Sequence, residues 1–154
     1  MFTRILVPVD GSDTSNKALA AAVRMTQGAD GRMRLVHVMD ELAYAADHPH
    51  YGSELMRAVR EEARRVLSDA SDVVAAASLT AEASLIESPG RRLGDVIAEE
   101  AKRWNADLVV VGTHGRRGFA RALLGSGADQ IIRTSPVPVL VVPPPSKDAA
   151  SKKK

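Results

Sequence analysis

Four residues in the last third of the chain have the types and spacing that suit a phosphate site. Gly112 and Gly115 follow the apolar run ADLVVV, and Gly125 and Ser126 come ten residues later. Glycines let backbone N–H groups approach an anion, and a helix that begins at Ser126 would add unpaired N–H donors and a hydroxyl. The pattern predicts two walls of a phosphate site. The alternative is an ordinary loop over 112–118 and a tight turn over 125–127.

Other polar residues could join this chemistry or do something simpler. Asp10 could hold a ribose hydroxyl or a metal-bound water, or it could cap the following helix. His114 could face a phosphate or lie in solvent, and Arg116 could attract phosphate or belong to a solvated face. His48 and His50 have no third ligand at a suitable spacing, so we predict no metal site made of side chains. No nucleophile has a recognisable base partner, so we assign no catalytic residue.

Apolar runs that alternate with helical patterns would position these residues. We expect strands over 5–9, 34–39, 79–85, 108–111 and 136–142, a loop over 40–52, and helices in the other intervals. The first helix is capped by Ser12 or Asp13, and His37, within the second strand, is interpreted as structural. Continuous apolar strands separated by amphipathic helices predict an α/β fold with an open, doubly wound parallel sheet and helices on both faces. Ligands bind such sheets outside the carboxyl ends of the strands.

Composition limits the class of protein. The chain has 154 residues, with a net charge of +2 and no cysteine. Residues 1–145 are expected to form one domain, and 146–154 a disordered lysine-rich tail. The tail carries four lysines and one aspartate, or +3, so the rest of the chain is near −1, which argues against a nucleic-acid surface. No apolar run is long enough for a membrane span, and the absence of cysteine and of a signal-like start favours the cytoplasm.

In these motifs the chain resembles a single-domain universal stress protein of the ATP-binding subclass. The likeness covers about residues 2–143, from ILVPVDGSDTSNKAL to VVVGTHGRRGFARALLGSGADQIIRTSPVPVLVVP. The family's nucleotide signature, Gly-x2-Gly-x9-Gly-Ser/Thr, is complete as Gly112, Gly115, Gly125 and Ser126. The resemblance implies a Rossmann-like sheet of five strands in the order 3-2-1-4-5.

The resemblance also implies ATP as ligand, with Mg2+ held mainly through the phosphates and Asp10 on the ribose. The residues expected to bind the nucleotide are Pro8, Val9, Asp10, Val38, Gly112, His114, Gly115, Arg116, Gly125, Ser126 and Gly127. Gly127 departs from the family, which usually has a β-branched residue there. Glycine in a first helical turn costs about 1 kcal/mol against alanine, which would soften the phosphate wall.

Members of the family usually form homodimers through the last strand, here Val137 to Val142, and an open edge of this kind would otherwise invite aggregation. The expected function is a regulatory ATP-binding module of the stress response. The alternatives are a slow ATPase, for which His114 is the one nearby candidate base, a binder of AMP or cyclic AMP, and a dimeric scaffold without nucleotide.

Overall fold

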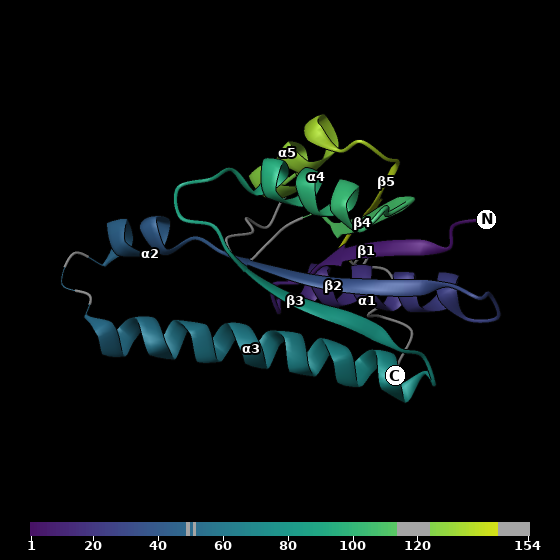
Figure 1. The fold of residues 1–154 in the computed structure, drawn as a ribbon, viewed down its shortest axis with the longest axis horizontal. Helices are drawn as coiled ribbons and strands as arrows, with labels where there is room; N and C mark the ends of the chain where they lie inside the picture. Colours follow the sequence, from purple (N-terminus) through teal and green to yellow (C-terminus); the bar gives the residue numbers. More distant parts are fainter. Residues whose placement is uncertain (49, 51, 114–123, 145–154) are drawn as a thin grey trace, which may run out of the picture.

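The computed structural model describes residues 1–48, 50, 52–113 and 124–144. Within these residues the chain forms a five-stranded parallel sheet in the order β3-β2-β1-β4-β5 (Figure 1). The strands are β1 (Arg4–Pro8), β2 (Arg32–Met39), β3 (Ala81–Glu87), β4 (Leu108–Gly112) and β5 (Val139–Val142). The helices are α1 (Asp13–Thr26), α2 (Glu41–Asp47), α3 (Ser53–Ala76), α4 (Leu93–Arg103) and α5 (Ser126–Thr134). The predicted fold class and strand order are confirmed; the predicted tail lies outside the described residues.

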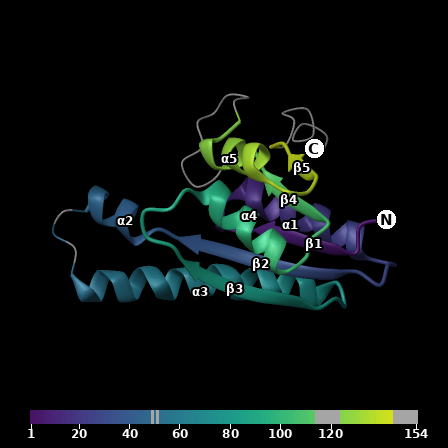
Figure 2. The ribbon, with the colours of Figure 1, turned by 45° about the horizontal axis from the view of Figure 1, so that its top comes forward.

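Helices cover both faces of the sheet. Helices α1 and α3 pack on one face, and α4 and α5 pack on the other (Figure 2). Successive residues of β1 serve the two layers, because Ile5 and Val7 belong to the core under α1 and α3, whereas Leu6 belongs to the core under α4 and α5. A strand buried on both faces must be apolar at every position, which explains the continuous apolar runs in the sequence.

A short helix replaces the loop that we expected over residues 40–52. Helix α2 begins after Asp40, whose Oδ1 accepts hydrogen bonds from the backbone N–H groups of Leu42 (3.1 Å) and Ala43 (3.2 Å). None of the side chains of α2 is buried. The helix is short and contributes no buried side chain to the core, so its clearest sequence signal is the capping residue Asp40.

The third strand begins two residues later than expected, at Ala81. Ser78 takes a positive φ of 59° after the end of α3, so the chain is still turning where the alternating pattern begins. Leu79 lies in this turn and packs against the core below α3. Leu79 is therefore apolar because of its contact with the core and not because it belongs to a strand.

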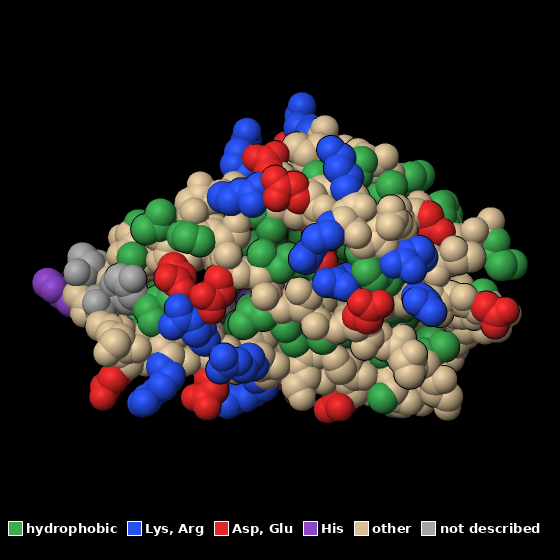
Figure 3. Space-filling view, viewed as in Figure 1, with side chains coloured by type: hydrophobic (Ala, Val, Ile, Leu, Met, Phe, Trp, Pro, Cys, Tyr) green, Lys and Arg blue, Asp and Glu red, His purple; other side chains and the backbone are tan. Residues whose placement is uncertain are grey.

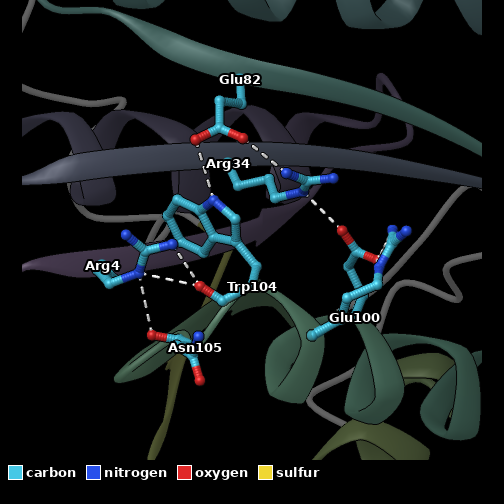
Figure 4. Close-up of polar contacts among 7 residues, drawn as sticks. Arg4, Arg34, Glu82, Glu100, Trp104 and Asn105 are labelled. Atoms are coloured by element: carbon cyan, nitrogen blue, oxygen red, sulfur yellow. Dashed lines mark hydrogen bonds and ion pairs between the residues drawn. The ribbon is translucent and has the colours of Figure 1, made fainter.

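Side chains at the amino ends of the strands form a closed polar network (Figure 4). Arg34 of β2 lies between Glu82 of β3 (Nη1 to Oε2, 2.7 Å) and Glu100 of α4 (Nε to Oε1, 2.6 Å). The indole N–H of Trp104 donates to Glu82 at 3.0 Å, and the guanidinium of Arg4 lies 4.3 Å from the Trp104 ring centroid. Glu100 is only 3% exposed, and its ion pair with Arg34 offsets the cost of burying the carboxylate. The network fixes α4 to the sheet.

Candidate functional site

A pocket of about 220 Å³ opens at the carboxyl ends of β1, β2 and β4. The order of the sheet reverses between β1 and β4, which is the place where doubly wound sheets bind ligands. Six of the residues predicted to bind nucleotide line the pocket: Pro8, Val9, Asp10, Val38, Gly112 and Gly127. Seven lining residues were not predicted: Ser15, Val36, His37, Leu93, Val111, Ala128 and Ile131. They come from five different elements, so no short motif in the sequence contains them.

Asp10 both supports the turn after β1 and lines the pocket. Its Oδ1 accepts a hydrogen bond from the backbone N–H of Ser12 (2.9 Å), and its own N–H donates to the Ser15 hydroxyl (3.1 Å). Of the two predicted capping residues, Ser12 and not Asp13 is the N-cap of α1, and its hydroxyl accepts from the Ser15 N–H. The capping interpretation of Asp10 is therefore correct in part, and the same contacts fix the carboxylate at the pocket wall.

His37 has a structural contact and also lines the pocket. Its Nδ1 lies 2.7 Å from the carbonyl oxygen of Val9, in the chain segment that follows β1. Because a carbonyl oxygen only accepts, Nδ1 carries the proton in this contact. The ring therefore joins β2 to the end of β1 at the border of the pocket.

Gly112 has a packing role that the signature does not express. A Cβ added at residue 112 would lie 2.5 Å from the carbonyl oxygen of Thr14 and 2.6 Å from its carbonyl carbon. Real Cβ atoms do not approach backbone atoms so closely, so the first turn of α1 can rest on the end of β4 only if residue 112 is glycine. This glycine is explained by helix packing whether or not a ligand is bound.

Gly125 and Ser126 form the start of α5, as predicted. Gly125 is the N-cap residue and makes no side-chain cap, so the N–H groups of the first turn have no capping side chain. The N–H of Gly125 donates to the carbonyl of Thr113 at 2.6 Å, which joins the two ends of the glycine-rich segment. Gly127, one residue into the helix, lines the pocket. His114, Gly115 and Arg116 lie outside the described residues.

Two further hollows share lining residues with the pocket. One, of about 360 Å³, lies against α2 and α3 and shares Asp10, His37 and Val38. The other, of about 440 Å³, lies at the start of α4 and shares Val38 and Leu93. Together they form a cleft along the carboxyl edge of the sheet.

Asp40 lines both outer hollows. Its carboxylate accepts a hydrogen bond from the backbone N–H of Gly90 at 3.0 Å, which ties the end of β2 to the turn before α4. The Gly90 contact lowers the pKa of Asp40, partial burial opposes it, and the N–H groups of Ala43 and Leu42 add to the lowering. The carboxylate is thus held in its charged form.

The described residues lack the features of two other classes of protein. They contain no group of three or more side chains placed to bind a metal ion. None of their helices combines the length and the apolar character that crossing a membrane requires. On the face seen in Figure 3, acidic and basic side chains are interspersed.

Comparisons with known proteins agree with this architecture. The YxiE universal stress protein of Bacillus subtilis is 30% identical over 150 residues, covering 92% of this chain and 99% of its own. A universal stress protein family structure from Burkholderia pseudomallei is 33% identical, with a TM-score of 0.74, and covers 93% of this chain and 97% of its own. Hypothetical protein MJ0577 gives a TM-score of 0.81 at 24% identity, covering 96% and 99%, and supports the fold alone.

Similar structures include complexes with a nucleotide. A universal stress protein in complex with cAMP is 26% identical, with a TM-score of 0.61, and covers 92% of this chain and 96% of its own. The model of the universal stress protein family matches residues 1–143. The chain therefore belongs to the universal stress protein family.

Proposed function

We propose that the protein is a regulatory module that binds ATP in the pocket at the carboxyl ends of β1, β2 and β4, with Mg2+ held mainly through the phosphates. The observation that carries the proposal is the pocket itself. It lies at the switch point, and it combines apolar walls with the carboxylate of Asp10 and the open end of a helix.

The base would bind where β2 runs past the end of β1. Strand β1 ends at Pro8, whose register partner is Val36, whereas β2 continues to Met39. The carbonyl of Val36 faces β1, because it accepts the N–H of Val9 at 2.8 Å. Val38, two residues further on, directs its N–H and C=O to the same side, beyond the last residue of β1. A donor and an acceptor on one backbone edge suit the edge of an adenine, and the apolar lining suits its faces.

The sugar and phosphates would extend from this point toward α5. Asp10 would accept hydrogen bonds from ribose hydroxyls, beside Pro8 and Val9. The phosphates would meet the N–H groups at the start of α5, the Ser126 hydroxyl, and the glycine-rich segment with His114, Gly115 and Arg116. Each charge-assisted hydrogen bond contributes about 1.5–3 kcal/mol. The described residues offer no cluster of metal ligands, which is why Mg2+ would depend on the phosphates.

AMP and cyclic AMP are the alternative ligands, because they share the adenosine contacts. The relative in complex with cAMP supports an adenine site in this fold. The pocket of about 220 Å³ is smaller than the roughly 300–1,000 Å³ of typical ligand sites, so it accounts for the base and part of the sugar. The number of phosphates therefore has to be settled by binding measurements.

We also propose a homodimer through β5 and a cytoplasmic location. In the described structure β5 pairs with β4 on one side only, and Leu140 in the middle of the strand is 37% exposed. Pairing with a second copy would cover this apolar edge, and such edges otherwise promote aggregation. Sedimentation of the protein should show a dimer, and Leu140→Lys should shift it toward the monomer.

The test of nucleotide binding begins with protein purified without added nucleotide. We expect mass spectrometry of the denatured sample to release ATP or ADP, and calorimetry of the emptied protein to detect ATP with Mg2+. Gly115→Val should abolish ATP binding and leave the unfolding transition unchanged. No released nucleotide and no binding of ATP, AMP or cyclic AMP would favour the scaffold. Turnover that exceeds a mock preparation and is lost in His114→Ala would favour the ATPase.

A further inference from the structure

The pocket has one wall that is made by two helices and not by the sheet. Leu93 is the first residue of α4, and Gly127 is the second residue of α5. Both line the 220 Å³ pocket, and Leu93 also lines the 440 Å³ hollow beside it. A Cβ added at residue 127 would lie only 2.9 Å from Cδ2 of Leu93. The leucine side chain therefore occupies the space that a side chain at residue 127 would need.

The two helices cannot move apart to relieve such a contact without breaking another. Gly94 packs against α5 so closely that an added Cβ would lie 2.7 Å from both the Gln130 carbonyl oxygen and the Thr134 hydroxyl. The N–H of Gly94 also donates to Oε1 of Gln130 at 3.2 Å. The backbone of α4 is thus fixed on α5 one residue after Leu93. A larger residue at 127 has to be accommodated by rotation of the Leu93 side chain.

We propose that Leu93 and Gly127 act as a pair that sets the width of the pocket between the start of α5 and Val38, and that Leu93 thereby favours a purine. The inference rests on the proposed nucleotide site. Leu93, Val111 and Ile131 line the pocket with apolar surface, and a two-ring base covers more of it than a one-ring base. Gly127 leaves the leucine in place, whereas a side chain at 127 pushes it from its present position between the two hollows.

A double-mutant cycle tests the pair. The proteins are wild type, Leu93→Ala, Gly127→Ala and the double variant, and calorimetry measures the affinity of each for ATP and for CTP. Leu79→Ala is the matched control, because Leu79 is also partly buried but lines none of the three hollows. Chemical unfolding of the four nucleotide-free proteins measures the coupling between residues 93 and 127 in the free energy of unfolding. The cycle cancels single-site effects, such as the higher helix propensity of alanine at residue 127.

We expect Gly127→Ala to weaken ATP binding about tenfold in the wild-type background and less than about twofold in the Leu93→Ala background. Leu93→Ala should lower the preference for ATP over CTP, and Leu79→Ala should leave it unchanged. Additive effects in both cycles, or an unchanged preference in Leu93→Ala, would overturn the inference. A failure of the proposed nucleotide-binding function would give a different result from a failure of this inference. Wild type would then bind neither nucleotide, which removes the role in specificity, while the unfolding cycle still reports whether residues 93 and 127 are coupled.

Discussion

The two ends of the sheet differ in what surrounds the strands: paired charged side chains at the amino ends and an open pocket at the carboxyl ends. At the amino ends, long charged side chains pair with one another, and Arg34 lies between Glu82 and Glu100 (Figure 4). At the carboxyl ends, the pocket is lined mostly by glycine and apolar residues, with Asp10, Ser15 and His37 as its polar side chains, and the helices α4 and α5 begin without side-chain caps. One end is filled by its own side chains, and the other leaves space and hydrogen-bonding groups for another molecule. Stability and binding should therefore be separable by mutation.

The largest effect expected from this comparison is at the amino ends. Glu100→Ala should lower the free energy of unfolding by about 3 kcal/mol, because it removes the buried partner of Arg34. Urea unfolding measures the loss, and the affinity for ATP should stay the same. Glu99→Ala is the control, since Glu99 is exposed and solvent screens its pair with Arg91, so this variant should unfold at nearly the wild-type urea concentration. Equal losses in the two variants would show that the network does not stabilise the fold.

Gly112→Ala should affect stability and binding together, because residue 112 both packs against α1 and lines the pocket. The added Cβ would meet the Thr14 carbonyl, so we expect a loss of about 2 kcal/mol in unfolding together with weaker ATP binding. Gly52→Ala is the control, because no atom lies within 4 Å of its added Cβ, and it should cost less than about 1 kcal/mol. A fully stable Gly112→Ala protein would contradict the packing argument.

Asp10→Asn should affect binding and leave stability unchanged, which is the reverse of the effect expected for Glu100→Ala. The amide oxygen can still accept the Ser12 N–H, so the free energy of unfolding should change little. Loss of the charge should weaken ATP binding by about 1.5 kcal/mol, or roughly tenfold, as measured by calorimetry. Unchanged affinity alongside unchanged stability would remove Asp10 from the ribose site.

The smallest effect concerns the cap of α2. Asp40→Ala should destabilise this helix by about 1 kcal/mol, detectable as faster amide hydrogen exchange over α2. Because the folded pKa of Asp40 is lowered, chiefly by the Gly90 N–H, the charged cap contributes stability above about pH 4 and loses it as the pH falls through the folded pKa. The difference between wild type and variant should therefore shrink in acid. A constant difference down to pH 2 would show that the charge does not matter.

The sequence predicts the fold well because the evidence for it is local. Continuous apolar strands, amphipathic helices and the Ser12 cap each require only a few neighbouring residues. It misses α2, which buries nothing, and it misplaces β3, because Leu79 is apolar for a contact made in a turn.

The candidate site is predictable only in part for the same reason. The spacing of Gly112, Gly125 and Ser126 identifies the start of α5, and Asp10 follows a strand. By contrast, Leu93 and Ile131 reach the pocket through the packing of α4 on α5, which no short stretch of sequence encodes. The packing role of Gly112 depends on where α1 crosses β4, so the signature alone could not reveal it.

The overhang of β2 beyond β1 has an evolutionary consequence. The groups that it offers at residue 38 belong to the main chain, so their recognition survives exchange of valine for most other residues. Drift at this position would change the fit of the base while keeping its hydrogen bonds. Proline is the exception, because it lacks the N–H. Under the proposed function, ligand preference can therefore change through neighbouring side chains such as Leu93 while the main-chain contact proposed for the base is kept.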